Sequence, residues 1–140
     1  MTSISIRLEE MPEHDDVHVL GDQLAAFNAQ TTGHNDGREL AIFLRDSDSE
    51  IVGGLYGWTW AGWLEIRYLW VHETLRGQGY GRRLLIMAED EARARGCSSA
   101  LLDSFSFQAP DFYRRLGYEE IATLREFPAR YHRAFFTKAI

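Results

Sequence analysis

The chain has 140 residues, of which 45% are hydrophobic and 13% aromatic, enough apolar material for a core, so we expect a single domain over residues 1–140. Its formal net charge of -6 and its lack of a Lys/Arg cluster argue against a nucleic-acid partner, which usually requires a basic face. The single cysteine excludes an intramolecular disulfide and a metal site of several thiolates, so we expect a reducing, cytoplasmic setting and no metal. No window of the sequence is long and apolar enough to span a membrane.

The N-terminal part of the chain predicts a strand and a helix. Ile4, Ile6 and Leu8 alternate with polar residues, which is the period-two pattern of a half-buried strand. Between residues 14 and 28, apolar side chains recur every three or four positions, which predicts an amphipathic helix. Gly33 then interrupts that pattern, so we expect a short irregular connection to follow.

Three strands are expected next, joined as two hairpins. Residues 40–45 and 51–60 are rich in strand-forming side chains and flank the polar residues 46–50, which suit a hairpin turn. A second turn at residues 61–62 leads into residues 63–71, which are apolar on both faces. This pattern predicts a central strand that is covered on both sides.

The second half of the chain predicts a strand-helix-strand crossover followed by a short helix and two strands. A helix is expected over residues 79–95, and a buried strand over residues 100–105 should lie parallel to the central strand. A short helix over residues 111–116 precedes two final strands, 118–124 and 133–139. The order β-α-β-β-β-α-β-α-β-β predicts an α/β fold, an α+β arrangement in which helices cover a mixed sheet.

The strongest chemical signal is a glycine-rich turn between the central strand and the helix that follows it. Gly77, Gly79 and Gly81 let the backbone approach a ligand closely, and the free amides and dipole of the helix start favour an anion. Arg76 adds a positive charge, so a pyrophosphate is the expected occupant, with a purely structural turn as the alternative. The dinucleotide pattern G-x-G-x-x-G fails because Arg82 occupies its third glycine, and the Gly-Lys-Ser/Thr of nucleoside triphosphate loops is absent.

This segment resembles the [QR]-x-x-G-x-[GA] element of the GNAT superfamily of N-acetyltransferases, matched here by Arg76, Gly79 and Gly81. Residues 64–71 end in the Leu-x-Val form usual for that superfamily's fourth strand, and residues 109–118 look like its A-x-x-F-Y-x-x-x-G-[FY] element. The similarity extends over essentially the whole chain and is most specific between these two elements.

The resemblance implies a splayed sheet in which acetyl-CoA wedges between the strands 63–71 and 100–105. Backbone groups of Leu69 and Val71 would bind the pantetheine arm as an added strand does, and the amides of residues 78–82 would hold the pyrophosphate. The residues expected to bind acetyl-CoA are Leu69, Trp70, Val71, Arg76, Gly77, Gln78, Gly79, Tyr80, Gly81 and Arg82.

Two positions depart from the family pattern. The family often has Asn three positions before the Ala matched by Ala109, and this chain has Ser106 there, so that side-chain contact to the cofactor is not expected. The family's second helix is shortened to a segment around residues 32–37, and that region commonly lines the acceptor pocket.

Acyl transfer from a thioester to an amine needs a neutral amine, a polarised carbonyl and a proton for the leaving thiolate. The resemblance implies Tyr113 as the acid, since it matches the family's Tyr near the coenzyme sulfur and a phenol with a pKa near ~10 is protonated at neutral pH. A simple core aromatic is the alternative for Tyr113. Glu65 is the expected base, because a carboxylate in an apolar strand is costly unless it is paired or useful. An ion pair with Arg67 or with another arginine is the structural alternative for Glu65, and a chain of waters or His72 is the alternative base.

The sequence says least about the acceptor. Trp58 and Trp60 are candidates to hold a cationic amine, with strand packing as the alternative, and Asp103 is a candidate anionic contact, with a solvated strand end as the alternative. We expect direct transfer in a ternary complex, because Cys97 at a helix end is poorly placed for a covalent intermediate. A small-molecule amine is the expected acceptor, and a homodimer is compatible with the sequence. A protein acetyltransferase acting on lysine or N-terminal amines, or a non-catalytic acyl-CoA-binding module, are the alternatives.

Overall fold

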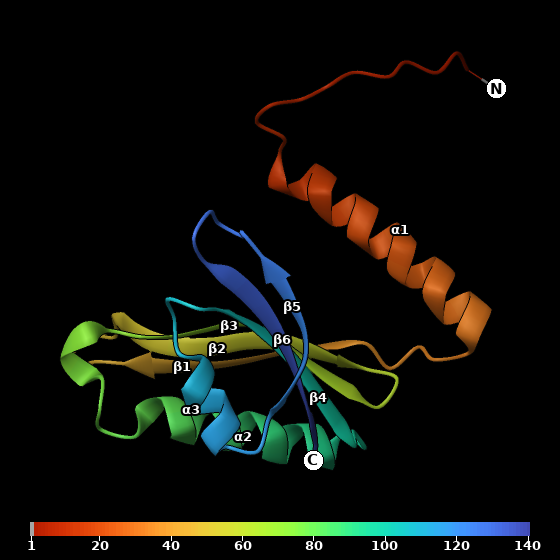
Figure 1. Cartoon of the computed structure of the whole chain (residues 1–140). Coiled ribbons are helices and arrows are strands. Elements are labelled where there is room, and N and C mark those ends of the chain that lie inside the picture. Colours follow the sequence, from red (N-terminus) through yellow and green to blue (C-terminus); the bar gives the residue numbers. More distant parts are fainter. Residues whose placement is uncertain (1) are drawn as a thin grey trace. The chain divides into compact units, whose positions relative to one another are not determined.

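The computed structural model describes residues 2–140 and divides the chain into two compact units, with the boundary after Asn35. The first unit contains the helix α1 (His14–Thr32), and the second, Asp36–Ile140, contains the sheet and the other helices of the described residues (Figure 1). The single domain expected from the chain length stays a prediction.

Helix α1 confirms the predicted N-terminal helix and continues about one turn beyond its predicted end. Asp15 and Asp16 lie in its first turn, where acidic side chains interact favourably with the helix dipole. Gly33 adopts a left-handed conformation with φ of 81°, and its N–H donates to the Ala29 carbonyl at 2.8 Å. This cap explains why the helix ends at a glycine.

The strand predicted from Ile4, Ile6 and Leu8 is wrong. Residues 2–13 form neither helix nor strand, and the three side chains are 80%, 95% and 84% exposed. A strand needs a neighbour that pairs with its backbone, and none of the described strands forms a ladder with this segment. The alternation indicates only that one face of an extended segment is apolar, and it does not supply the pairing partner.

The second unit is a mixed sheet of six strands with helices packed on it, which confirms the predicted α+β fold. Its strands lie in the order β1-β2-β3-β4-β6-β5, and only the β3–β4 pair is parallel. Every helix and strand of the second unit lies within two residues of its predicted bounds, apart from a short 3-10 helix that was not predicted. The elements are β1 (Arg38–Arg45), β2 (Ile51–Trp60), β3 (Trp63–Val71), η1 (Glu73–Leu75), α2 (Tyr80–Ala94), β4 (Ser99–Phe105), α3 (Pro110–Arg115), β5 (Glu119–Arg125) and β6 (His132–Ala139).

Helix α2 and the sheet form the hydrophobic core of the second unit. Leu85 and Ala88 of α2 are fully buried, as are Leu64 of β3 and Phe136 of β6. Burying an apolar side chain of the size of leucine contributes about 1.5–3 kcal/mol relative to leaving it exposed. The core therefore fixes α2 along the sheet (Figure 1), which sets the position of its first turn.

A buried polar cluster also joins α2 to the last strands. The Glu89 side chain of α2 is only 4% exposed, and it accepts a hydrogen bond from the Tyr118 hydroxyl at 2.8 Å. Lys138 of β6 donates to the other carboxylate oxygen at 2.9 Å. A buried carboxylate is tolerated when its charge is paired and its oxygens are hydrogen-bonded, and both conditions hold for Glu89.

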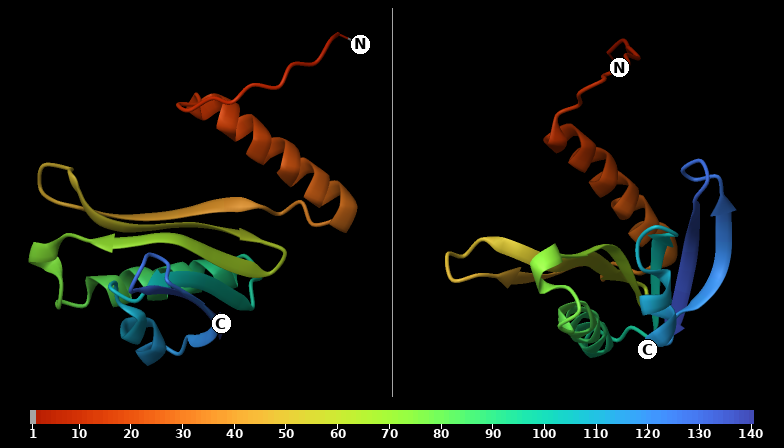
Figure 2. Two further views of the ribbon diagram at one scale, coloured as in Figure 1. Left: turned by 45° about the horizontal axis from the view of Figure 1, so that its top comes forward. Right: turned by 60° about the vertical axis from the view of Figure 1, so that its left-hand side comes forward.

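The sheet opens between β3 and β4. These strands pair only from Trp63↔Ser99 to Glu65↔Leu101, so the rest of each strand lacks its neighbour in the ladder. Figure 2 shows β4, β6 and β5 turning away from β1, β2 and β3 beyond this point. The sheet is therefore splayed as the resemblance implied.

A β-bulge lies where the splay begins. Tyr56 and Gly57 of β2 are consecutive, but they face Tyr68 and Ile66 of β3, so Arg67 has no partner on β2. A Cβ on Gly57 would overlap the Glu65 carbonyl oxygen, so the close approach of the two strands requires glycine there. Bulges bend a strand and redirect its side chains, and the extra residue of this one, Arg67, lies two positions after Glu65.

Candidate functional site

The splay forms a cavity of about 1310 Å³ within the second unit. Its walls come from β3, the loop before α2, β4, α3 and β6. The structure brings together on this surface twelve of the residues predicted from the sequence: Glu65, Leu69, Trp70, Val71, Arg76, Gly77, Gly79, Tyr80, Gly81, Arg82, Asp103 and Tyr113. Gln78, Trp58 and Trp60 are not part of the lining.

The second half of β3 presents to the cavity backbone groups that pair with no neighbouring strand. The His72 N–H donates to the Val52 carbonyl at 2.9 Å, so the backbone groups of His72 point toward β2. Because alternate residues of a strand point their backbone groups the same way, those of Leu69 and Val71 point toward the edge that β4 has left. The Arg76 Nε already donates to the Val71 carbonyl at 3.0 Å. This edge can accept an extended, amide-containing molecule as an added strand.

The glycine-rich turn confirms the local geometry expected for an anion site. Gly77 and Gly79 have φ of 76° and 85°, a left-handed conformation that favours glycine. The first hydrogen bond of α2 runs from the Arg83 N–H to the Gly79 carbonyl at 3.1 Å. The amides of residues 80–82 therefore have no acceptor within the helix, and they lie at its positive end.

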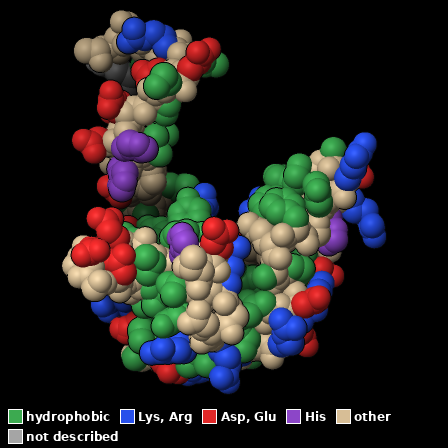
Figure 3. All heavy atoms as spheres, turned by 90° about the vertical axis from the view of Figure 1, so that its left-hand side faces the viewer, with side chains coloured by type: hydrophobic (Ala, Val, Ile, Leu, Met, Phe, Trp, Pro, Cys, Tyr) green, Lys and Arg blue, Asp and Glu red, His purple; other side chains and the backbone are tan. Residues whose placement is uncertain are grey.

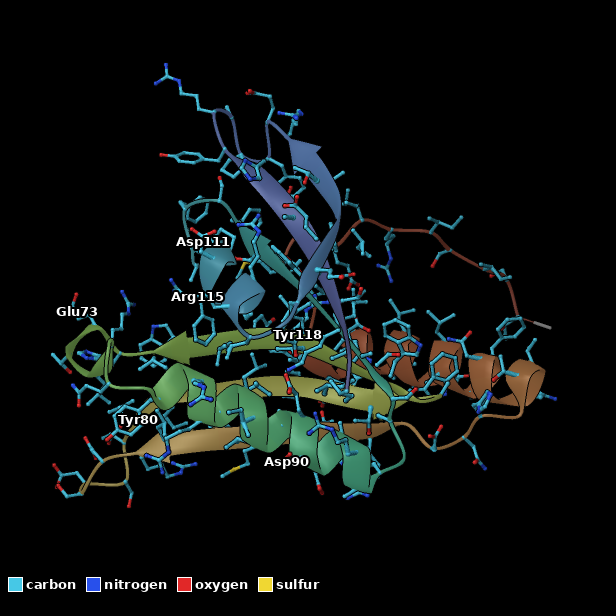
Figure 4. The ribbon with its side chains drawn as sticks, turned by 60° about the horizontal axis from the view of Figure 1, so that its bottom comes forward. Glu73, Tyr80, Asp90, Asp111, Arg115 and Tyr118 are labelled. Carbon is cyan, nitrogen blue, oxygen red and sulfur yellow. The ribbon has the colours of Figure 1, made fainter. Side chains whose placement is uncertain are left out.

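Two contacts hold this turn in place. The Gln78 side chain donates to the Thr74 carbonyl at 3.1 Å, so Gln78 supports the loop rather than lining the cavity. A Cβ on Gly81 would lie 3.4 Å from Cζ of Phe112, so the first turn of α2 packs closely against α3. Figure 4 shows Tyr80 on α2 and Arg115 on α3, both of which line the cavity.

These observations together fit acetyl-CoA. The free edge of β3 suits its amide-containing arm, and the amides of residues 80–82 suit its pyrophosphate. The Arg76 and Arg82 side chains also line the cavity near the turn and add positive charge. The residues present therefore provide both the hydrogen-bonding strand edge and the anion site that such a molecule needs.

Tyr113 lies on α3 between other aromatic rings. Its ring is 5.2 Å from that of Phe112, 6.1 Å from that of Tyr118 and 6.2 Å from that of Phe136. Burial, with a smaller contribution from the negative charge of Asp103, raises the pKa of Tyr113 to about 12. No described residue forms a hydrogen bond with its hydroxyl, and the residue lines the cavity. Tyr113 is thus a protonated donor whose hydroxyl has no protein acceptor.

Glu65 is half-buried and lines the cavity at the last paired position of β3 and β4. The ion pair with Arg67 is not formed, since neither residue takes part in a salt bridge within residues 2–140. His72 caps η1 instead, where its Nδ1 accepts from the Thr74 N–H at 3.2 Å, and it lies outside the lining. Glu65 is therefore a carboxylate of the cavity wall without a protein counter-ion.

The two tryptophans proposed for the acceptor lie outside the cavity wall. Trp58 faces Glu65 across the β2–β3 ladder, and its ring meets that of Tyr56 edge-on at 6.5 Å. Trp60 pairs with Trp63 at the hairpin end of the same strands. The role of these tryptophans at the acceptor stays a prediction.

Sequence reasoning did not identify the wall formed by β6 and the loop before it. Arg133 donates from Nε to Asp103 Oδ2 at 2.7 Å, and Phe127 and Phe135 also line the cavity. No motif marks these residues, since they reach the cavity only through the pairing of β4 with β6. The local sequence gives one indication of a binding role: Arg133 is a cation in a segment, residues 131–136, that is otherwise mostly aromatic or apolar.

Cys97 takes no part in the cavity. It is 7% exposed, belongs to the hydrophobic core and is a free cysteine. Burial raises the pKa of its thiol, which keeps it protonated and unreactive. Among the described residues, no group of three or more His, Cys, Asp or Glu is arranged to hold a metal ion, and no helix is long and apolar enough to cross a membrane.

The chain is similar in sequence to known acetyltransferases. A model of the Acetyltransferase (GNAT) family matches residues 5–118. Acetyltransferase Atu2258 of Agrobacterium fabrum is 39% identical over 117 residues, which cover 84% of this chain and 85% of that protein. Blasticidin-S acetyltransferase of Streptomyces morookaense is 41% identical over 80 residues, 56% of this chain and 59% of that one.

Solved structures have the same fold. A crystal structure of a protein from Agrobacterium tumefaciens, assigned as an acetyltransferase, has a TM-score of 0.87 at 34% identity and covers 98% of this chain and 100% of its own. An aminoglycoside 6'-N-acetyltransferase in complex with coenzyme A has a TM-score of 0.64 at 19% identity, covering 86% of this chain and 91% of its own. The latter is a likeness of fold alone.

Proposed function

The chain belongs to the GNAT family of acetyl-CoA-dependent acetyltransferases, and we propose that it transfers the acetyl group to a primary amine of a small molecule, directly and in a ternary complex. The observation that carries this proposal is the splay cavity. One continuous surface joins the free edge of β3 and the glycine-rich turn to Tyr113 and Glu65. This continuity supports a site in which the expected donor-binding and acid–base groups act together.

When bound, acetyl-CoA supplies an acetyl group on a thioester and a thiolate as the leaving group. Glu65 accepts a proton from the acceptor amine, directly or through a water, while the nitrogen forms its bond to the acetyl carbon. Tyr113 donates its phenolic proton to the sulfur as the carbon–sulfur bond breaks. The proton held by Glu65 returns through solvent to Tyr113, so both groups regain their starting states.

The small-molecule acceptor has support from one relative. Blasticidin-S acetyltransferase, which is 41% identical over 80 residues, is named for a small-molecule substrate. A protein acetyltransferase remains the second candidate. The homodimer and the cytoplasmic setting stay predictions. All residues of the edge strand β5 are exposed, so this strand offers a surface for a second copy of the chain. Sedimentation velocity, which measures the mass of the particle in solution, tests the homodimer.

Release of free thiol from acetyl-CoA tests the proposal. The purified chain is incubated with acetyl-CoA and a panel of small amines, lysine peptides and peptides with free N-termini, and products are identified by mass spectrometry. We expect thiol release above the acceptor-free background with at least one small amine. Release only with peptides would replace the small-molecule acceptor. A raised melting temperature with acetyl-CoA but no release with any acceptor would mean a non-catalytic binding module.

A further inference from the structure

The wall of the cavity on the β4–β6 side carries a charged pair that the transfer chemistry does not use. Asp103 and Phe105 of β4 lie opposite Phe135 and Arg133 of β6, so these four side chains share one face of the ladder, and all four line the cavity. Arg133 Nε and Asp103 Oδ2 are 2.7 Å apart, and the side chains are 30% and 27% exposed. The pair is therefore neither buried in the core nor fully solvated.

Three aromatic rings hold the guanidinium of Arg133. Its central carbon lies 5.0 Å from the ring centre of Phe135 and 5.4 Å from those of Phe105 and Phe127. Cation–π contacts of this kind fix the plane of a guanidinium and restrict its rotamers. Arg133 is thus set in one orientation before any ligand arrives.

The fixed guanidinium has hydrogen-bond donors to spare. Asp103 takes the Nε–H, and no described residue accepts from the two terminal nitrogens of Arg133. An arginine carries five N–H groups in a planar fork that matches a carboxylate. Arg133 thus lies in the cavity wall against aromatic rings, and its two terminal nitrogens are free to donate. This arrangement suits the binding of a planar anion.

Arg133 and the expected phosphate site lie on different strands of the splayed sheet. Arg133 lies on β6, and β4 separates that strand from β3 in the sheet. The anion site of the glycine-rich turn follows β3, on the other side of the splay. Asp103, which pairs with Arg133, lines the same cavity as Tyr113, and its charge contributes to raising the pKa of the Tyr113 hydroxyl, so the pair and the expected acid belong to one site.

We propose that Arg133 binds a carboxylate of the acceptor, so that the preferred acceptors are amines that also carry an acid group, with the part between them packed on the phenylalanine rings. This inference rests on the proposed function. The carboxylate would bind the two terminal nitrogens of Arg133, since Asp103 already accepts its Nε–H at 2.7 Å.

Further aromatic side chains line the cavity beside the Asp103–Arg133 pair. The rings of Phe105 and Phe107 stack at 5.4 Å, and Phe107 meets Tyr131 edge-on at 5.2 Å. Phe107 and Phe127 are 56% and 44% exposed, and hydrophobic side chains gather at the tip of the β5–β6 hairpin in Figure 3. An aromatic spacer is therefore favoured over an aliphatic one.

Four amines that differ in only two features test the proposal. They are 4-(aminomethyl)benzoate, benzylamine, 6-aminohexanoate and hexylamine, which combine presence or absence of an acid with an aromatic or aliphatic spacer. We expect kcat/KM to be at least about 10-fold higher for each acid than for its neutral counterpart, as for a charged hydrogen-bonded pair. The value for 4-(aminomethyl)benzoate should be the highest of the four.

The variant Arg133→Gln should remove the acid preference. We expect KM for the two acids to rise about 10-fold or more while kcat is retained, and KM for the neutral amines to stay or fall, because Asp103 then lacks its counter-ion. Arg133→Lys keeps the charge without the fork and should give an intermediate preference. Arg125→Gln is the matched control, since Arg125 is exposed on the neighbouring strand β5 and outside the lining.

Binding without turnover separates this inference from the proposed function. Calorimetry with 4-methylbenzoate, which has the ring and the acid but no amine, should show a dissociation constant about 10-fold higher for Arg133→Gln than for the wild type and for Arg125→Gln.

Equal kcat/KM for acids and neutral amines, or an acid preference that survives in Arg133→Gln, would overturn the proposal. If no amine is acetylated at all, the proposed function fails, and the calorimetric comparison still decides the role of Arg133. If Arg133→Gln does not fold, Arg133→Lys and the double variant Asp103→Asn/Arg133→Gln, which leaves no unpaired charge, are compared instead.

Discussion

Tyr113 combines burial with an unused hydroxyl, which gives a specific prediction for Tyr113→Phe. The pKa of about 12 means that the phenol stays protonated throughout the neutral range and can act only as a donor. Removing a general acid lowers turnover by about 10²-fold or more. We expect kcat in the thiol-release assay to fall by this amount, with the affinity for acetyl-CoA unchanged, because the groups expected to bind the donor lie on β3 and α2.

Tyr118→Phe is the matched control for that variant. Tyr118 is also a buried tyrosine, and its ring touches that of Tyr113, but its hydroxyl is bonded to Glu89 and it does not line the cavity. This control should lose stability and keep its kcat once folded. An unchanged rate in Tyr113→Phe, or equal losses in both variants, would remove Tyr113 from the mechanism.

The residues of the site differ in how far the sequence could predict them. Gly79, Gly81 and Tyr113 belong to short motifs whose function depends on local geometry. Residues adjacent in the sequence determine that geometry. Arg133 reaches the cavity because β6 pairs with β4 in one particular register, and no neighbouring residue reports that register. The local geometry of the glycine-rich turn was therefore predictable, and the β6 wall was not.

At the scale of the elements, periodicity predicted the helices and strands of the second unit well. It failed for Ile4, Ile6 and Leu8, where the pattern was present and the pairing partner was not. It also missed the bulge opposite Gly57, because a bulge changes the register of two strands without changing the composition of either. The splay, which forms the site, begins beside this bulge.

The bulge predicts a strong effect for Gly57→Ala. The added Cβ would overlap the Glu65 carbonyl oxygen, which is backbone and cannot move without shifting β3. We expect a loss of about 1–3 kcal/mol in the free energy of unfolding in urea, as for overpacked positions, together with a fall in activity as Glu65 moves. Gly37→Ala is the control, since its Cβ would meet only a Trp60 ring atom at 3.5 Å. Equal stability of the two variants would show that the strands tolerate a side chain there.

At the scale of the whole molecule, two buried tyrosines link the site to overall stability. Burial, and then the hydrogen bond to Glu89, raise the pKa of Tyr118 far above its ordinary value, and burial raises the pKa of Tyr113 to about 12. The Tyr118 hydroxyl bonds to Glu89 of α2, and the ring of Tyr113 packs against those of Tyr118 and Phe136. We therefore expect Tyr113 to contribute both to the reactivity of the cavity and to the alkaline stability of the fold.

This coupling predicts a loss of stability above pH 10. In the unfolded chain a tyrosine loses its proton near its ordinary pKa of about 10, whereas in the folded chain Tyr113 keeps its proton until about pH 12. The folded state thus binds more protons between these values, so the contribution of Tyr113 is fully present below pH 10 and declines as the pH rises toward 12, by up to about 2–3 kcal/mol. Urea unfolding at pH 8.5, 9.5, 10.5 and 11 (roughly spanning the ordinary tyrosine pKa) should show a falling free energy of unfolding, with a shallower fall in Tyr113→Phe. Tyr131→Phe, which removes the hydroxyl of a 48% exposed tyrosine, should follow the wild type. If Tyr113→Phe instead lost stability as steeply as the wild type, the buried phenol would not be the group that holds its proton in the folded state.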